Sequence, residues 1–382
     1  MSYLKPFLGN TLIEENALPR IEAVLNNKAV FRYAADNQFC RQVEKLTEKI
    51  LHTKHALLLT NGTAALKAAL LGLKPVPGQY VLIPSISFIA TANAVLSSGL
   101  IPVLVDVDES GGLSPVALET GLRQLPTPPL AVIAVHLEGA SAQIERISAI
   151  CQRYNIALIE DCAQSMAVTH QGSPVGSFGD YGCFSFQSNK LISSGEGGLL
   201  IASDEQLFRR ASMVTDHGAT RTPDGMPDWS DSIGFGENCK FNELQATLLI
   251  NQLEHIDKMC DLLRDRYAAL CEYLPAEAVD TRPEGSIPVS IWLKRGRLGI
   301  NLLRSPLLYD WKSWDLFSHP VLRKRLSPYA NAFPWSLHTD TLPEPSLTQH
   351  WQLLEQRLCL PVSLDDSIHQ RVLELLKTEG SR

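Results

Sequence analysis

The sequence has no apolar run that approaches about 18 residues, so we expect no membrane-spanning helix. It also has no block of basic residues, and its formal net charge of -7 argues against a nucleic-acid-binding surface. The first ten residues lack a basic stretch followed by an apolar run, so we expect no secretory signal. These absences predict a cytoplasmic protein whose partners are small molecules, with no nucleic-acid or membrane partner.

The cysteines show no Cys-x-x-Cys spacing, although the chain has eight of them. A chain of this length needs no disulfide framework, and scattered thiols are typical of small buried side chains in a reducing compartment. We therefore expect neither a disulfide scaffold nor a metal site. The eight residues are Cys40, Cys151, Cys162, Cys183, Cys239, Cys260, Cys271 and Cys359.

Short apolar runs alternate with helix-like stretches between about residues 57 and 203. Nearly continuous apolar runs suit strands that are buried on both faces of a parallel sheet, and their alternation with helices predicts a doubly wound α/β layer. The predicted strands lie at 81–83, 103–105, 131–135, 157–159, 183–186 and 199–202, and predicted helices lie at 63–73 and 142–154.

A further helix is predicted after the last of these strands. Apolar residues recur every three to four positions from Leu249 to Leu270, and Asn242 with Gln245 forms a capping pair before them. We read this pattern as one long helix that leads into a second domain. The predicted domains are a large α/β domain with an N-terminal helical segment, residues 1–255, and a smaller C-terminal α+β domain, residues 256–382.

Lys190 is the first residue that suggests chemistry. It stands in the loop after the strand around 183–186, and the glycine-rich turn Gly195 to Gly198 follows it. Taken alone, the segment suits a surface lysine beside a tight turn as well as a reactive amine.

Two other segments suggest ligand binding. Asp161 stands at the carboxyl end of the strand 157–159, where ligands bind in open α/β sheets, although such an acid can also cap the next helix. Gly62 and Thr63 open a helix, and the free N–H groups at a helix start can bind an anion or be satisfied by simple capping.

Together the three segments fit one cofactor. Pyridoxal phosphate needs a lysine amine for its aldehyde, an acid for its pyridine nitrogen, and an anion site for its phosphate. Phe88 can stack against the ring, although a lone aromatic residue is also common in a core.

With these segments in order, the sequence resembles the DegT/StrS family of pyridoxal-phosphate-dependent sugar aminotransferases. The resemblance runs from about Leu57 to Leu270. It implies the fold type I architecture of aspartate aminotransferase, a mainly parallel mixed sheet sandwiched by helices with a smaller α+β domain. The matching segments are Gly62-Thr63, 84–91, 105–108, His136 with Gly139, 160–164, 184–186, Lys190, 195–198, 216–218 and 238–246.

The resemblance also implies roles for individual residues. Lys190 would bond to the cofactor, Asp161 would pair with the pyridine nitrogen, and Lys190 and Asp161 would be the catalytic residues. Gln164 would lie by the ring oxygen and Phe88 would stack on the ring. The phosphate would be held by Gly62, Thr63, Ser185 and, from the neighbouring subunit, Asn238. This implies a homodimer with shared active sites.

The implied reaction transfers an amino group from glutamate or glutamine to a keto sugar, either nucleotide-linked or a keto sugar acid. The cofactor would alternate between pyridoxal phosphate and pyridoxamine phosphate. Cys239-Lys240-Phe241 departs from the family's aromatic-Arg-Met run, which puts contacts near the subunit boundary in doubt.

Two alternatives remain at this point. One is a pyridoxal-phosphate sugar dehydratase, in which a histidine would replace Lys190. The other is a cofactor-binding regulator without turnover. A Rossmann dehydrogenase fits poorly, because no Gly-x-Gly-x-x-Gly follows an early strand.

Overall fold

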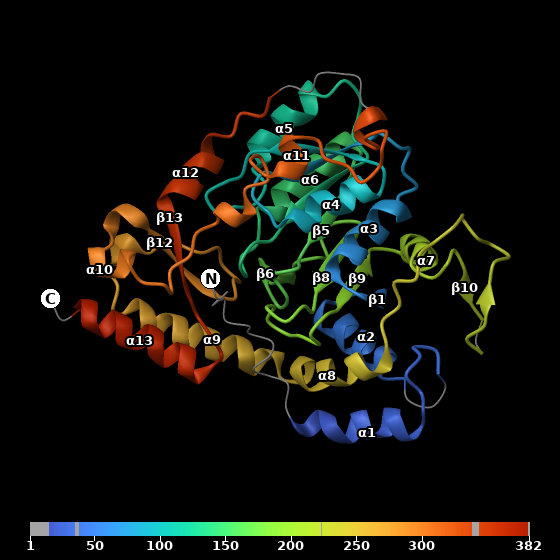
Figure 1. Ribbon diagram of the computed structural model, residues 1–382, viewed down its shortest axis with the longest axis horizontal. Helices are drawn as coiled ribbons and strands as arrows, with labels where there is room; N and C mark the ends of the chain where they lie inside the picture. Colours follow the sequence, from blue (N-terminus) through green and yellow to red (C-terminus); the bar gives the residue numbers. More distant parts are fainter. Residues whose placement is uncertain (1–14, 35–37, 223, 338–343, 381–382) are drawn as a thin grey trace.

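The computed structural model describes residues 15–34, 38–222, 224–337 and 344–380 (Figure 1). The first ten residues, for which no secretory signal is expected, lie outside these ranges. A seven-stranded sheet forms the centre, in the order β1-β9-β8-β5-β4-β2-β3, and β9 is its antiparallel member. The strands are β1 (Ala56–Leu59), β2 (Tyr80–Pro84), β3 (Ile101–Val105), β4 (Ala131–Val135), β5 (Ala157–Asp161), β8 (Tyr181–Ser185) and β9 (Gly198–Ala202).

Helices cover both faces of this sheet, so alternate residues of a strand enter different cores. In β4, Ile133 packs into the core beneath α3, α4 and α7, whereas Val132 and Ala134 pack beneath α5 and α6. Burial on both sides explains the continuous apolar runs, and the predicted α/β layer with a mainly parallel mixed sheet is confirmed. The helices are α3 (Gly62–Gly72), α4 (Ile89–Ser97), α7 (Glu205–Val214), α5 (Pro115–Gln124) and α6 (Ile144–Tyr154).

The predicted long helix is wrong in one respect, because it is two helices, α8 (Glu243–Glu254) and α9 (Ile256–Cys271). Asn242 caps α8 as predicted and accepts a hydrogen bond from Gln245 N at 3.0 Å. His255 leaves the helical conformation between them, with φ -116° and ψ 16°. The break lets α8 pack on α2 (Phe39–Ile50) while α9 packs on α13 (Asp366–Gly380), which one straight helix would not reach.

The C-terminal part pairs strands β12 (Ser290–Lys294) and β13 (Arg357–Pro361) in antiparallel fashion among helices. Trp292 and Trp311 from this part share a core with the central sheet, and the domain boundary at residue 255 stays a prediction. The remaining elements are α1 (Leu18–Asn26), α10 (Ile300–Leu303), α11 (Pro320–Arg323), α12 (Thr348–Gln356), β6 (Thr169–His170), β7 (Ser173–Pro174), β10 (Thr220–Arg221) and β11 (Pro227–Asp228).

One C-terminal segment lies directly against the loop that follows β2. Ile86 and Asp315 form an antiparallel bridge, and Ser87 N donates to Trp314 O at 3.0 Å. These contacts with residues 314 and 315 hold the loop from 85 to 88 in place. Among the described residues, no helix has the length and apolar character needed to cross a membrane.

Candidate active site

The predicted site residues follow four strands that run parallel to one another. Gly62 comes after β1, Phe88 after β2, Gln164 after β5 and Lys190 after β8. Because parallel strands end at the same edge of a sheet, these loops gather at one edge. Asp161 is the last residue of β5 and lies in the middle of this group.

The Asp161 carboxylate is buried, with an exposed fraction of 6%. Oδ2 accepts from the Thr91 hydroxyl at 2.8 Å, and Oδ1 accepts from Ala163 N at 3.2 Å. Burial raises the pKa of Asp161, while these hydrogen bonds and the charges of Lys190 and His136 oppose the rise. The positive charge of Lys190 is thus one of the influences that favour the ionised carboxylate, after the hydrogen bonds from Thr91 and Ala163.

Lys190 stands in a loop whose backbone groups hydrogen-bond to one another. Lys190 N donates to Gln187 O at 2.9 Å, and Ser188 N donates to Gly195 O at 3.0 Å. Gly195 adopts a φ of +84°, which favours glycine, so the glycine-rich turn has a conformational cause. The loop holds the lysine partly buried at the sheet edge.

Gly62, which has no side chain, and the adjoining Ser185 form a cradle at the start of α3. A Cβ on Gly62 would approach Ser185 Cβ to 3.0 Å and Ser185 Oγ to 3.5 Å, so the two residues adjoin. Asn61 caps the helix by accepting from Ala64 N at 2.8 Å. Thr63 is the second residue of the helix, whose dipole favours an anion at this end.

Phe88 precedes Asp161 in the sequence, and Gln164 follows it. Phe88 begins α4 and is 57% exposed, which is unusual for a phenylalanine in a large domain. Gln164 Oε1 accepts from Glu138 N at 3.0 Å. Its amide oxygen is therefore occupied, and the amide nitrogen is the group left to donate to a ligand.

Asn238 lies in an exposed segment beside β1. It forms an isolated bridge with Asp216, and Lys240 forms one with Leu59. Burial would raise the pKa of Asp216, but hydrogen bonds from Arg221 and Lys240, at 2.7 and 2.6 Å, lower it to about 2. The atypical Lys240 thus has an anionic partner in its own chain.

A buried group of possible metal ligands, His136, Glu160 and Cys162, lies beside the site, with ligand atoms within 4.8 Å of one another. His136 Nε2 lies 3.0 Å from Glu160 Oε2, and Ala142 N donates to His136 Nδ1. Glu160 also accepts from backbone N–H groups at 176, 178 and 179. These hydrogen bonds give both residues a structural task, and the absence of a metal site stays a prediction.

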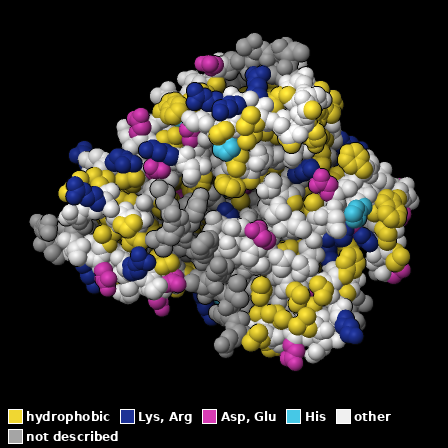
Figure 2. Space-filling model, in the orientation of Figure 1, with side chains coloured by type: hydrophobic (Ala, Val, Ile, Leu, Met, Phe, Trp, Pro, Cys, Tyr) yellow, Lys and Arg dark blue, Asp and Glu magenta, His cyan; other side chains and the backbone are white. Residues whose placement is uncertain are grey.

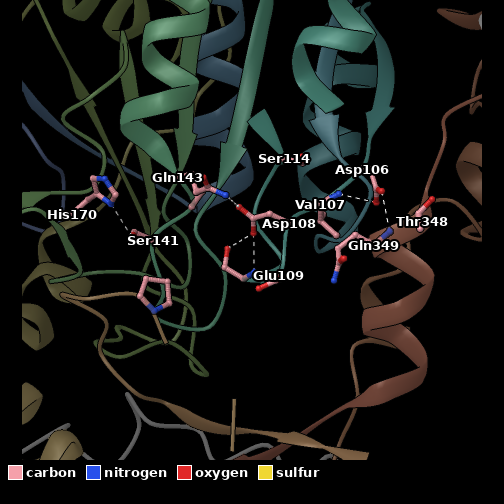
Figure 3. Close-up of a pocket in the computed structure, with 13 residues that line it drawn as sticks. Asp106, Val107, Asp108, Glu109, Ser114, Ser141, Gln143, His170, Thr348 and Gln349 are labelled. Atoms are coloured by element: carbon pink, nitrogen blue, oxygen red, sulfur yellow. Dashed lines mark hydrogen bonds between the residues drawn. The ribbon is translucent and has the colours of Figure 1, made fainter. Parts of the chain in front are cut away.

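A cavity of about 480 Å³ opens at the carboxyl end of β3 (Figure 3). Asp106 accepts from Gln349 N and caps α12, while Asp108 accepts from Ser110 and Gln143. Burial raises the pKa of Asp108. The Asp106 and Asp108 carboxylates thus hold the starts of a helix and a turn, and none of the eight predicted site residues lines this cavity.

Sequence reasoning missed three residues that contact the site. Thr91 bonds to Asp161, Ser87 lies 2.7 Å from the Thr91 hydroxyl, and Glu138 bonds to Gln164 through its backbone. Thr91 and Ser87 both lie in the segment 84–91 that resembles the family, but no role was assigned to them, and nothing in the sequence marked Glu138.

Solved structures with the same architecture identify the class. A DegT/DnrJ/EryC1/StrS aminotransferase from Brucella abortus superposes with a TM-score of 0.81 at 24% identity, covering 98% of this chain and 97% of that one. The chain therefore has the fold type I architecture.

Sequence comparisons then identify the family. Residues 11–286 match the model of the DegT/DnrJ/EryC1/StrS aminotransferase family. A GDP-perosamine synthase from Caulobacter vibrioides is 31% identical over 80% of this chain and 81% of its own length. The L-glutamine:2-deoxy-scyllo-inosose aminotransferase of Micromonospora echinospora is 35% identical over 67% of this chain, which spans 61% of that relative. The chain belongs to the DegT/DnrJ/EryC1/StrS aminotransferase family and is an aminotransferase.

Family membership implies pyridoxal phosphate as the cofactor, and the described residues fit it. The buried Asp161 carboxylate is suited to a protonated ring nitrogen, and Lys190 supplies the amine nearby. The lack of a side chain at Gly62 lets Ser185 lie directly against the start of α3, where free N–H groups and a hydroxyl suit a phosphate.

Proposed function

We propose that this protein transfers an amino group from glutamate or glutamine to a keto sugar, giving an amino sugar. The observation that carries the proposal is that the buried Asp161 ends β5 while Lys190 follows β8, the neighbouring parallel strand, which brings both residues to the carboxyl edge of the sheet. The names of two relatives support the substrate class, since one makes GDP-perosamine and the other aminates an inosose with L-glutamine.

Lys190 and Asp161 are the proposed catalytic residues. Bound pyridoxal phosphate supplies an aldehyde that exchanges amino groups and a pyridine ring that withdraws electrons from the carbon being deprotonated. Lys190 Nζ anchors the cofactor and, after release by the donor, takes the proton from the donor's α-carbon and later returns a proton. Asp161, as an anion, holds a proton at the ring nitrogen.

The other predicted residues orient the cofactor. Phe88 covers one face of the ring, because its exposed side chain begins α4 directly beside the turn that carries Thr91. Gln164 would donate its amide N–H to the ring oxygen, since its own carbonyl oxygen accepts from Glu138 N. Gly62, Thr63 and Ser185 hold the phosphate, with Asn238 of a second subunit completing the site.

We further propose a homodimer in the cytoplasm. The arm that carries β10 and β11 exposes large apolar side chains: Phe235 is 95% exposed, Met226 60% and Trp229 55%. Figure 2 shows apolar side chains gathered at the edge of the molecule where Figure 1 places this arm. Such a surface is typical of an interface, and a second copy of the chain is the occupant that Asn238 requires. All eight cysteines are free, as suits a reducing compartment.

Lys190→Ala tests the proposal. We expect the variant to fold and to retain pyridoxal phosphate weakly. It should lose both half-reactions and the yellow absorbance of the lysine-linked cofactor, because no other amine can replace Nζ. Borohydride reduction followed by mass spectrometry should find the cofactor mass on the peptide with Lys190 in wild type. The exposed Lys45 offers a matched control, since Lys45→Ala should behave as wild type.

Retained transamination in Lys190→Ala would refute the assignment. Wild-type colour that persists with both glutamate and glutamine would refute the proposed donors. Loss of colour with glutamate, and its return with a keto sugar, supports the proposed reaction.

A further inference from the structure

Three buried side chains form a hydrogen-bonded chain that ends at Asp161. The Thr91 hydroxyl lies 2.8 Å from Asp161 Oδ2, and the Ser87 hydroxyl lies 2.7 Å from the Thr91 hydroxyl. Ser87 is 2% exposed, Thr91 1% and Asp161 6%. Water therefore has little access to replace any member of the chain.

Chemistry fixes the direction of these hydrogen bonds when Asp161 is ionised. A carboxylate only accepts, so Thr91 must donate its single hydroxyl proton to Asp161. The Thr91 oxygen then accepts from Ser87, whose proton must point toward Thr91. Each hydroxyl is thus held in one orientation, and the arrangement stabilises the anion and not the neutral acid.

The far end of the chain is anchored by the backbone. Ser87 N donates to Trp314 O and Leu316 N donates to Ser85 O, both at 3.0 Å. Thr91 N donates to Phe88 O at 3.1 Å in the first turn of α4. These bonds tie the backbone at Ser87 to the segment 314–316 and fix the backbone at Thr91 in the first turn of α4.

We propose that Thr91 is a positioning residue that keeps the Asp161 carboxylate ionised and aimed at the cofactor's ring nitrogen, with Ser87 setting the direction of the Thr91 hydroxyl. This inference rests on the proposed function of Asp161. The Thr91 hydroxyl bonds to Asp161 and Ser87, so its effect on the reaction passes through Asp161.

Loss of this hydroxyl has a predictable consequence. Asp161 is faced by Thr91, Ala163 N, Lys190 and His136, and without Thr91 it loses the donor that opposes its burial. The carboxylate then binds a proton more tightly. The proton shared with the ring nitrogen shifts toward the carboxylate, and the ring becomes a weaker electron acceptor.

The test uses the full-length holoenzyme with Thr91→Val, which keeps the shape of the side chain and removes the hydroxyl. Cofactor labelled with ¹⁵N at the ring nitrogen reports its protonation through the chemical shift, and single-turnover mixing with glutamate gives the half-reaction rate. We expect a shift toward the unprotonated ring and a rate lower by roughly tenfold or more, with cofactor affinity changed by less than about threefold.

Three further variants sharpen the test. Thr91→Ser should restore most of both signals, and Ser87→Ala should give a smaller loss of the same kind. Thr47→Val is the matched control, because Thr47 is equally buried and bonds only to its own helix backbone. It should leave the ¹⁵N shift and the rate at wild-type values.

The inference is overturned if Thr91→Val keeps the wild-type ¹⁵N shift and rate. If Thr91→Val does not fold, an unchanged ¹⁵N shift in Ser87→Ala has the same force. Lys190→Ala distinguishes a failure of the proposed function from a failure of the proposed role of Thr91. Transamination by that variant defeats the proposed function, whereas a normal Thr91→Val beside an inactive Lys190→Ala defeats only the role of Thr91.

Discussion

Two neighbouring carboxylates in β5 have opposite tasks. Side chains alternate across a strand, so Asp161 follows Ile159 toward α4 whereas Glu160 follows Leu158 toward α6. Glu160 is fully buried and accepts hydrogen bonds from three backbone N–H groups and His136. Asp161 has fewer donors, and burial raises its pKa. One carboxylate is satisfied by the protein, and the other is suited to a ligand.

This contrast predicts different outcomes for two conservative variants. Asp161→Asn should slow the glutamate half-reaction on the order of a hundredfold, because an amide cannot hold a proton at the ring nitrogen. Without cofactor this variant should be at least as stable as wild type. A carboxyl whose folded pKa is raised lowers stability at neutral pH, and the substitution removes that cost.

Glu160→Gln should lower the stability of the protein and leave the cofactor site unchanged. Its amide N–H group would meet backbone donors, so we expect a loss of roughly 2–3 kcal/mol in unfolding free energy with a normal cofactor spectrum. Urea unfolding with and without cofactor, and stopped-flow absorbance, measure both variants. Equal half-reaction rates in Asp161→Asn and wild type would contradict the assignment of Asp161.

The sequence indicated Lys190 and Asp161 because each stands at or after an apolar strand and because the segments around them resemble the family. The local pattern therefore indicates that the side chain stands at the sheet edge. Thr91 and Glu138 were not predictable in the same way. Their contacts with Asp161 and Gln164 join residues that are 70 and 26 positions apart, and only the sheet order brings those loops together.

At the scale of elements, the cradle depends on how closely β9 approaches the start of α3. A Cβ on Gly198 would overlap the Asn61 carbonyl group and come within 2.8 Å of Gly62 N. The first residue of β9 must therefore be glycine for the turn after β1 to keep its place. The sequence showed a glycine-rich turn, but only the pairing of β1 with β9 explains this glycine.

Gly198→Ala should weaken cofactor binding by displacing this turn. Overpacking of this kind costs roughly 1–3 kcal/mol, which corresponds to about a fivefold to hundredfold rise in the dissociation constant of pyridoxal phosphate if the strain falls on the cofactor-bound form. Fluorescence titration of the cofactor-free protein measures the change. Gly296→Ala is the control, since an added Cβ there meets nothing within 4 Å. Wild-type affinity in Gly198→Ala would show that the cradle does not bind the phosphate.

The break between α8 and α9 shows that apolar periodicity predicts the buried face of a helix but not where the helix ends. The apolar spacing from Leu249 to Leu270 is correct, and both helices bury that face. Nothing at His255 marks an end in the sequence, because it is neither glycine nor proline. The break follows from two separate packing partners, α2 and α13, which lie far apart in the chain.

At the scale of the whole molecule, the C-terminal residues support the site at two points. Trp314 O holds Ser87 and thereby the chain to Asp161. Tyr309 and Ser290 donate to the Glu138 carboxylate, both at 2.7 Å, and Glu138 N holds Gln164. Asp161 and Gln164, two of the predicted contacts with the cofactor ring, are therefore both supported by residues between 290 and 314.

The proposed exchange of Asn238 between subunits can be tested by mixing two inactive proteins. Asn238→Asp should be nearly inactive, because its carboxylate would repel the cofactor phosphate. In a hybrid dimer with Lys190→Ala, one site combines the intact Lys190 of one subunit with the intact Asn238 of the other. The second site carries both defects.

Recovery of activity on mixing is therefore expected only if Asn238 acts across the interface. With random reassociation half of the dimers are hybrids and each has one working site, so the mixture should regain about a quarter of wild-type activity. Steady-state transamination after denaturation and joint refolding measures it, and each variant refolded alone is the control. A mixture as inactive as its components would place Asn238 in its own subunit's site, and a monomer in light scattering would remove the shared site altogether.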